Sequence, residues 1–366
     1  MGIRLRGIEL YMGPRVLGAP DDLDRVVREF IAGARSHLMI AVQELDSRPI
    51  AEAVLAAKAA GVRVQVILEG DYLVEPATSD DPWTPGGAHE TNRTIHAALL
   101  RAGVDVITDL NPAIFHQKFV VRDPEDDTAA VLTGSANFTR TDTGTNPPDN
   151  PEQRGNNLNH VLVLHGRRIA AQYLIEFARM RSGTFGDLRE RHEPRPAELR
   201  LGHVRVKPLF APRHGPEMEI MKQMLKSAGS IDFAMFTFAR SSGIDDTMLR
   251  LVGSLDRLRG VLDRGQGMQA WAATPLLRSA GVELYQNKAG TGVRKVHHKL
   301  MVIDERVVIA GSFNYTAPAT TINDENLIVL GDLEETDKAA ESAQRRLARF
   351  ALKEIDRIST ELATRV

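Results

Sequence analysis

One sequence pattern occurs twice in this chain, with the two copies about 180 residues apart. The first copy is FHQKFVVRD at 115–123, followed by TGSANFT at 133–139. The second is VHHKLMVID at 296–304, followed by AGSFNYT at 310–316. Both copies fit H-x-K-x4-D and then G-S-x-N. Because a long internal repeat marks a duplicated structural unit, we expect two similar halves.

The hydrophobic patterning repeats together with the motifs. Apolar residues at helical spacing predict an amphipathic helix near 23–31 and another near 218–224, each followed by a buried strand, at 38–42 and 231–236. Further helix–strand pairs follow in both halves, which indicates an α/β fold with mixed sheets covered by helices on both faces. We place the halves at 1–200 and 201–366, with the join in the polar segment 182–202. A long packing helix is expected at 333–362.

Two segments interrupt the repeat. Residues 71–92 and 140–156 are rich in Gly, Pro, Asp and Thr, so both are predicted to be loops, and the second half has no counterparts of similar length. Long loops on a regular scaffold are often functional rims or lids. A tolerated surface insertion is the alternative interpretation.

Composition excludes several classes of function. The 366-residue chain has no cysteine, which excludes disulfides, thiolate metal sites and a catalytic thiol. Its formal net charge of −2 gives no global basic field. The N-terminus lacks the apolar run of a secretory signal, and no stretch is long and apolar enough to span a bilayer. We therefore expect a soluble cytoplasmic protein without stable membrane insertion.

The repeated motifs bring together groups that suit phosphoryl chemistry. Side chains two apart on a strand share a face, so His116 and Lys118 point the same way, as do His297 and Lys299. The glycine of G-S-x-N permits a sharp turn. Two copies brought together would place two imidazoles across a pocket lined by ammonium and amide donors. One imidazole can attack phosphorus and the other can protonate the leaving oxygen, while the lysines supply positive charge without a metal.

These paired motifs resemble those of the phospholipase D superfamily. The resemblance implies a duplicated α/β/α sandwich with pseudo-twofold-related halves, one active site between them, and phosphodiester cleavage through a phosphohistidine without metal or other cofactor. Carried over by motif, the catalytic residues are His116, Lys118, Asn137, His297, Lys299 and Asn314. The supporting residues are Asp123, Ser135, Asp304, Ser312 and Glu325. Asp123 and Asp304 stand at an odd offset from their histidines, so we expect them to point away and to be structural.

A further segment differs between the halves. The superfamily often carries N-x-E-N after the Ser/Asn turn, with the Glu bonded to the nucleophilic His. The second half has this pattern at 323–326, with Glu325, whereas the first half has NNLN at 156–159, with Leu158 where the Glu is expected. This difference makes His297 the better supported histidine. Because the N-terminal histidine is the nucleophile in many two-motif members, the sequence leaves the nucleophile open.

Three functions compete for this site. A nuclease acting on DNA or RNA is favoured, because residues 201–366 carry 23 basic against 20 acidic residues, whereas residues 1–200 carry 23 against 28. Lys288, Arg294 and Lys295 precede the second motif as tentative substrate-binding residues. The alternative is a phospholipase D or phosphatidyltransferase acting on lipid headgroups, for which the acidic loop around Trp83 is a weak membrane contact. A scaffold without turnover is the third. Hydrolysis versus transfer and the oligomeric state stay open.

Overall fold

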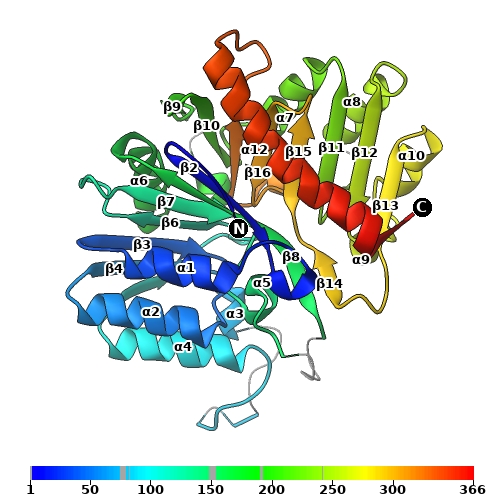
Figure 1. Cartoon of the computed structure of the whole chain (residues 1–366). Helices are drawn as coiled ribbons and strands as arrows, with labels where there is room; N and C mark the ends of the chain where they lie inside the picture. The colour runs from blue at the N-terminus through cyan, green and yellow to red at the C-terminus, as the bar shows by residue number, and fades with distance from the viewer. Residues whose placement is uncertain (1, 75–79, 82, 148–153, 190–192, 241) are drawn as a thin grey trace.

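The computed structural model describes residues 2–366 except 75–79, 82, 148–153, 190–192 and 241. Parts of the two predicted loops and of the predicted join lie outside the described residues. The described chain forms two α/β units, each built on a mixed sheet with helices on its faces (Figure 1). The predicted duplicated fold is confirmed.

The first sheet has the strand order β1-β2-β8-β7-β6-β3-β4-β5. Strands β3, β4 and β5 are parallel, and the other pairs along this order are antiparallel. Helices cover both faces of the sheet, and the sequences of the central strands are therefore almost continuously apolar. The strands are β1 (Ile3–Leu5), β2 (Ile8–Gly13), β3 (His37–Val42), β4 (Arg63–Leu68), β5 (Asp105–Thr108), β6 (Lys118–Arg122), β7 (Ala130–Gly134) and β8 (Asn156–His165).

The helices of the first half include the predicted amphipathic one. It begins after Asp22, whose side chain accepts the Arg25 N–H at 3.0 Å, and it buries Leu23, Val27 and Ile31 against the sheet. The helices are α1 (Leu23–Ala32), α2 (Arg48–Ala59), α3 (Asp71–Val74), α4 (Glu90–Arg101), α5 (Arg140–Thr143) and α6 (Arg167–Arg181), with short turns η1 (Arg15–Leu17) and η2 (Gly186–Leu188).

The second sheet repeats the strand order of the first, with β18 added at one edge. Its order is β18-β13-β12-β11-β15-β16-β17-β10-β9, so β10 corresponds to β2, β17 to β8, β16 to β7 and β15 to β6. The strands are β9 (Leu199–Leu201), β10 (Val204–Ala211), β11 (Ser230–Met235), β12 (Arg257–Leu262), β13 (Glu283–Asn287), β15 (Lys299–Ile303), β16 (Val307–Gly311), β17 (Glu325–Leu330) and β18 (Ala363–Arg365). Strand β9, which spans the expected boundary between the halves, pairs with β10.

The helices of the second half end with the longest of the described helices. They are α7 (Pro216–Leu225), α8 (Ile244–Leu251), α9 (Arg264–Gly267), α10 (Thr274–Ser279), α11 (Ala317–Thr321) and α12 (Lys338–Arg357), which continues as the π-helical turn η3 (Ile358–Leu362). Helix α12 begins later than expected because Asp337 caps it, accepting the Ala340 N–H at 2.7 Å. Within the described ranges, no helix combines the length and the apolar character that crossing a membrane requires.

The two halves are joined by a shared core and by exchanged strand pairing. One buried cluster contains side chains of both sheets together with α6 and α12. Strand β14 (Val293–Val296), from the second half, pairs in parallel with β8 of the first. Reciprocally, Phe115 forms a parallel bridge with Asp324. Each exchanged pairing ends directly before a motif histidine, so the fold carries both histidines to the same interface.

Candidate active site

His116 and His297 line one cavity of about 670 Å³ at the interface of the halves, together with Asn137 and Asn314. The strands of the two motifs begin at Lys118 and Lys299, so both histidines precede them. The main chain fixes each histidine on the opposite half, because the His116 N–H donates to the Asp324 carbonyl and the His297 N–H to the Leu158 carbonyl, both at 2.9 Å.

The glycine of each G-S-x-N turn is required by close backbone packing. Gly134 has φ +156°, and a Cβ there would lie 2.3 Å from the His160 carbonyl oxygen; Gly311 has φ +144°, and a Cβ would lie 2.4 Å from the Asn326 carbonyl oxygen. The turns place Asn137 and Asn314 in the cavity lining, and the side-chain oxygen of each is buried and finds no hydrogen-bond partner among the described residues. Unpaired buried polar atoms at a cavity are typical of a ligand site.

The motif lysines are buried beside the histidines and do not belong to the cavity lining. Lys118 Nζ donates to the His116 carbonyl at 3.0 Å and to Gln43 Oε1 at 3.2 Å. Lys299 Nζ donates to the His297 carbonyl at 2.9 Å and lies 5.1 Å from the centre of the Phe236 ring. Burial lowers the pKa of Lys118 to about 8. Burial and the Lys118 charge also lower the pKa of Lys299 well below its usual value.

Glu325 bonds His116, not His297. The distance from His116 Nδ1 to Glu325 Oε2 is 2.6 Å, and the same oxygen accepts from Ser312 Oγ at 2.6 Å. The expectation that Glu325 supports the histidine of its own half is wrong. The reason is the exchanged pairing, because β17 of the second half lies against the motif of the first. Burial and the charges of the two motif lysines lower the pKa of His116, and burial raises the pKa of Glu325 to about 8.

Asn159 is the structural counterpart of Glu325 in the first half. Asn159 pairs with Gly13 of β2, and Glu325 pairs with Ala211 of β10. Asn159 and Glu325 therefore occupy the same place in equivalent sheets. Placing Leu158 there was wrong by one residue, because strand register rather than the flanking asparagines defines the equivalence. Asn159 Oδ1 lies 2.9 Å from His297 Nδ1 and accepts from Ser135 Oγ at 2.8 Å.

Asp142 is a site residue that the sequence analysis missed. It lines the cavity, and its Oδ2 lies 3.6 Å from His297 Nδ1 and accepts the Asn137 N–H at 2.7 Å. Thr139 caps α5 by accepting the Asp142 N–H, just as Thr316 caps α11 by accepting the Ala319 N–H. Asp142 therefore has an alanine as its counterpart. The helix-start spacing of Thr139 and Asp142 is the signal that could have pointed to it.

Charged and aromatic side chains surround the imidazoles. Arg294 and Lys295, predicted as substrate-binding residues, line the cavity, as do Arg240, Tyr72, Phe236 and Trp271. Lys288 is not part of the lining. Glu44 lines the first-half side, and burial together with the Asp46 and Asp142 charges raises its pKa to about 8.

The motif aspartates lie away from the cavity lining and hold turns. Asp123 accepts the backbone N–H groups of Arg35, Ser36 and His37 at 2.8–3.1 Å. Asp304 accepts those of Ala228, Gly229 and Ser230 at 2.7–2.9 Å. Each carboxylate therefore fixes the start of the central strand beside its motif.

Comparisons with known proteins bear on the family and the fold of the chain. The family model described as "Cardiolipin synthase, PLD-like domain" matches residues 27–181 and 220–347. The chain is 34% identical over 103 residues to the mitochondrial cardiolipin hydrolase of Chlamydomonas reinhardtii, covering 28% of this chain and 44% of that protein. It is 30% identical over 158 residues to a phospholipase D of Rickettsia bellii, covering 41% of this chain and 72% of that protein. The phosphatidylserine synthase of Haemophilus influenzae superposes with a TM-score of 0.65 and 12% identity over 100% of this chain and 88% of that one, a likeness of fold.

Proposed function

The chain belongs to the phospholipase D superfamily, and from that premise we propose that it is a phosphodiesterase whose active site is shared between its halves. One observation carries the proposal. Two imidazoles line a common cavity, and the Nδ1 atom of each is held by a side chain of the opposite half, Glu325 for His116 and Asn159 for His297. A neutral imidazole whose Nδ1–H donates a hydrogen bond has an unprotonated Nε2 that can attack phosphorus or accept a proton.

The partners of the two histidines favour His116 as the nucleophile. When Nε2 bonds to phosphorus the ring becomes cationic, and the Glu325 carboxylate, 2.6 Å from Nδ1, can stabilise that charge. Asn159 is a neutral amide and gives His297 no such charge. Burial and the charge of Lys299 lower the pKa of His297. The Asp142 carboxylate, 3.6 Å from His297 Nδ1, acts in the opposite direction and favours the protonated ring that a general acid needs.

The reaction then proceeds in two balanced steps. In the first, a bond forms between His116 Nε2 and phosphorus, the bond to the leaving oxygen breaks, and that oxygen takes the Nε2 proton of His297. In the second, His297 Nε2 removes a proton from water, the water oxygen bonds to phosphorus, and the bond to His116 breaks. An alcohol in place of water would give transfer instead of hydrolysis.

The lysines and asparagines offset the charge on the phosphoryl oxygens. Lys118 and Lys299 lie buried beside the two histidines, where low polarity strengthens their attraction for an anion. Asn137 and Asn314 bring amide groups to the cavity lining. The positive charge therefore comes from the chain's own side chains.

For the substrate, we propose an unpaired nucleic-acid strand. Arg240, Arg294 and Lys295 line the cavity together with the aromatic rings of Tyr72 and Trp271. Cations beside aromatic faces suit a strand whose phosphates need neutralising and whose bases can stack.

A phospholipid headgroup is the second candidate. Two apolar side chains of the cavity lining are partly exposed, Ile114 at 41% and Trp271 at 44%, and apolar groups of this kind suit contact with acyl chains. The names of the two relatives, a cardiolipin hydrolase and a phospholipase D, also point to lipid substrates.

A single panel of substrates separates these candidates. The purified chain is incubated with single-stranded DNA, RNA, plasmid, cardiolipin vesicles and the small diester bis(p-nitrophenyl) phosphate, with His116→Ala as the control. We expect cleavage of the small diester and of a nucleic-acid strand, both lost in the control. Release from vesicles alone would support the second candidate, and failure to cleave any diester would contradict the proposed activity.

A further inference from the structure

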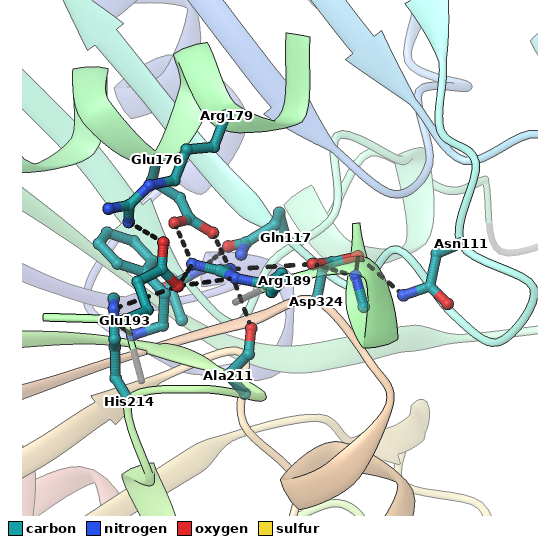
Figure 2. Close-up of polar contacts among 12 residues, drawn as sticks. Asn111, Gln117, Glu176, Arg179, Arg189, Glu193, Ala211, His214 and Asp324 are labelled. Atoms are coloured by element: carbon teal, nitrogen blue, oxygen red, sulfur yellow. Dashed lines mark hydrogen bonds and ion pairs between the residues drawn. The ribbon is translucent and has the colours of Figure 1, made fainter. Parts of the chain in front are cut away.

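A buried cluster of charges lies where the join between the halves meets the site (Figure 2). Its centre is Arg189, whose side chain is 1% exposed. The guanidinium donates hydrogen bonds to two carboxylates. Its Nη2 lies 2.7 Å from Glu176 Oε2 of α6 and 2.8 Å from Glu193 Oε2, further along the join. A third carboxylate, that of Asp324, has its Oδ1 3.9 Å from Arg189 Nη1.

The cluster carries more negative than positive charge, and the loss of Arg189 would increase the difference. Three carboxylates face two guanidinium groups, since Arg179 of α6 also pairs with Glu193. His214 is close to Glu193, but burial and the neighbouring arginines lower its pKa to about 3, so it adds no positive charge near neutral pH. Removing Arg189 would take away the ion-pair partner of the buried Glu176 carboxylate, which is strongly unfavourable.

The cluster is connected to His116 through Asp324. The Asp324 carboxylate accepts the Gly186 N–H at 3.1 Å and Asn111 Nδ2–H at 2.7 Å. The main-chain carbonyl of Asp324 accepts the His116 N–H, and the side chain of the next residue, Glu325, bonds to His116 Nδ1. Arg189 also donates to the Ala211 carbonyl at 3.2 Å, on the residue that stands opposite Glu325 in the sheet.

The other end of the site holds its histidine without a carboxylate at the equivalent position. The position equivalent to Asp324 is Leu158, a fully buried apolar residue whose carbonyl accepts the His297 N–H at the same 2.9 Å. A carboxylate is therefore not needed to form the main-chain bond. Of these two equivalent positions, only the one on the His116 side carries a carboxylate.

We propose that Arg189 and Asp324 are positioning residues, through which the join between the halves holds Glu325 against the His116 ring. The join then contributes a residue that positions the active site, in addition to connecting the halves. The kinetic consequence rests on the proposed phosphodiesterase function, whereas the effect on the ring does not. Burial raises the pKa of Asp324 to about 7, whereas the hydrogen bonds from Gly186 and Asn111 and the Arg189 charge act in the opposite direction.

Kinetics with bis(p-nitrophenyl) phosphate test this proposal. Arg189→Met removes the guanidinium, and Asp324→Leu copies the residue of the other half. We expect kcat to fall about 10- to 100-fold in both, with KM within about twofold of the parent, since displaced reacting groups lower the rate. Asp324→Asn, which keeps an acceptor oxygen, should recover part of the loss. The control is Arg195→Gln, also in the join, whose side chain is 48% exposed. Unchanged kcat in folded Arg189→Met and Asp324→Leu would overturn the proposal.

Imidazole NMR provides a readout that needs no activity. In protein labelled with ¹⁵N-histidine, the Nδ1–H resonance of His116 is assigned by its absence from His116→Ala. It should shift in Arg189→Met and Asp324→Leu and stay unchanged in Arg195→Gln, while the His297 resonance stays fixed in all three. Should Arg189→Met fail to fold, the two Asp324 variants decide. If the parent cleaves no diester, the proposed function fails, but a His116 resonance that ignores these substitutions would still contradict the positioning role.

Discussion

The two ends of the active site, around His116 and around His297, have the same backbone arrangement but different side chains. At each end a serine of the G-S-x-N turn bonds the residue that holds a histidine, and at each end that histidine belongs to the opposite half. The holding residue is a carboxylate, Glu325, at the His116 end and an amide, Asn159, at the His297 end. The duplicated halves have kept the same backbone arrangement, whereas the side chains that influence the charge of each imidazole differ.

Neighbouring positions diverge in the same way. The residue after Asn159 is His160, whose ring stacks on that of His298 with the two Nδ1 atoms 3.2 Å apart. The residue after Glu325 is Asn326, which donates to Gln117 Oε1 at 2.9 Å. Equivalent places across the pseudo-twofold thus carry different polar pairs. The difference teaches that two equal motifs need not perform equal chemistry.

The largest expected effect comes from making the His116 end resemble the His297 end. Glu325→Gln replaces the carboxylate by an amide of the same shape, as the other end already has. Without the negative charge the phosphorylated ring is less stabilised, so kcat should fall by about 10²- to 10⁴-fold. Steady-state hydrolysis of bis(p-nitrophenyl) phosphate measures it. A loss below threefold would show that the carboxylate is not what distinguishes the two ends.

A smaller effect is expected from Asp142→Asn at the other end. The substitution removes the anion that favours protonated His297, so cleavage of a diester with an alkoxide leaving group should slow by about tenfold or more. Release of p-nitrophenolate, which needs no proton, should stay near the parent rate. Rates for the two leaving groups in parent and variant check this. Equal slowing of both would contradict the role of Asp142 in proton donation.

The pH dependence of adduct formation should differ between the parent and Glu325→Gln. The raised pKa of Glu325, about 8, means that the carboxyl gains its negative charge only as pH rises toward that value. With p-nitrophenyl leaving groups, the parent rate should therefore rise about tenfold per pH unit below this pKa and level off above it. Glu325→Gln has no carboxyl to titrate and should lack the rise. Stopped-flow bursts between pH 5 and 9 provide the test, and parallel profiles would argue against Glu325 as the titrating group.

The smallest effects are expected from the two serines. Ser312→Ala removes a hydrogen bond to the Glu325 carboxyl, and Ser135→Ala removes one to the Asn159 amide. Bonds to charged groups contribute about 1.5–3 kcal/mol and neutral ones about 0.5–1.5 kcal/mol, so at a pH above the pKa of Glu325, where its carboxyl is ionised, Ser312→Ala should destabilise the chain more. Urea unfolding of the two variants gives the comparison. The reverse order would indicate that Glu325 is neutral in the folded protein.

The fold and the cavity-lining histidines and asparagines were open to prediction from local patterns. Alternating strands and helices, and two motifs at equal places in a repeat, are properties of neighbouring residues. The structure places His116, His297, Asn137 and Asn314 in the lining of one cavity. The burial of Lys118 and Lys299 outside its lining was not foreseen, because a shared strand face does not say how far a side chain reaches.

Contacts between the halves could not be predicted in the same way. That Glu325 reaches His116 depends on which strands pair across the interface, and no local signal in β17 records it. The equivalence of Asn159 with Glu325 depends on sheet register, which a match of flanking asparagines misplaced by one residue. The contact of Asp142 with His297 likewise joins segments far apart in the sequence.

The central claim is that His116, and not His297, carries the phosphoryl group. Rapid acid-free quenching of the parent and of His297→Ala with phosphorus-labelled bis(p-nitrophenyl) phosphate, followed by peptide mapping, tests it directly. The account predicts label on the peptide containing His116 in both proteins, with more accumulating in His297→Ala because the second step lacks its base. Label on the peptide containing His297 in the parent, or none on either histidine during turnover, would contradict it.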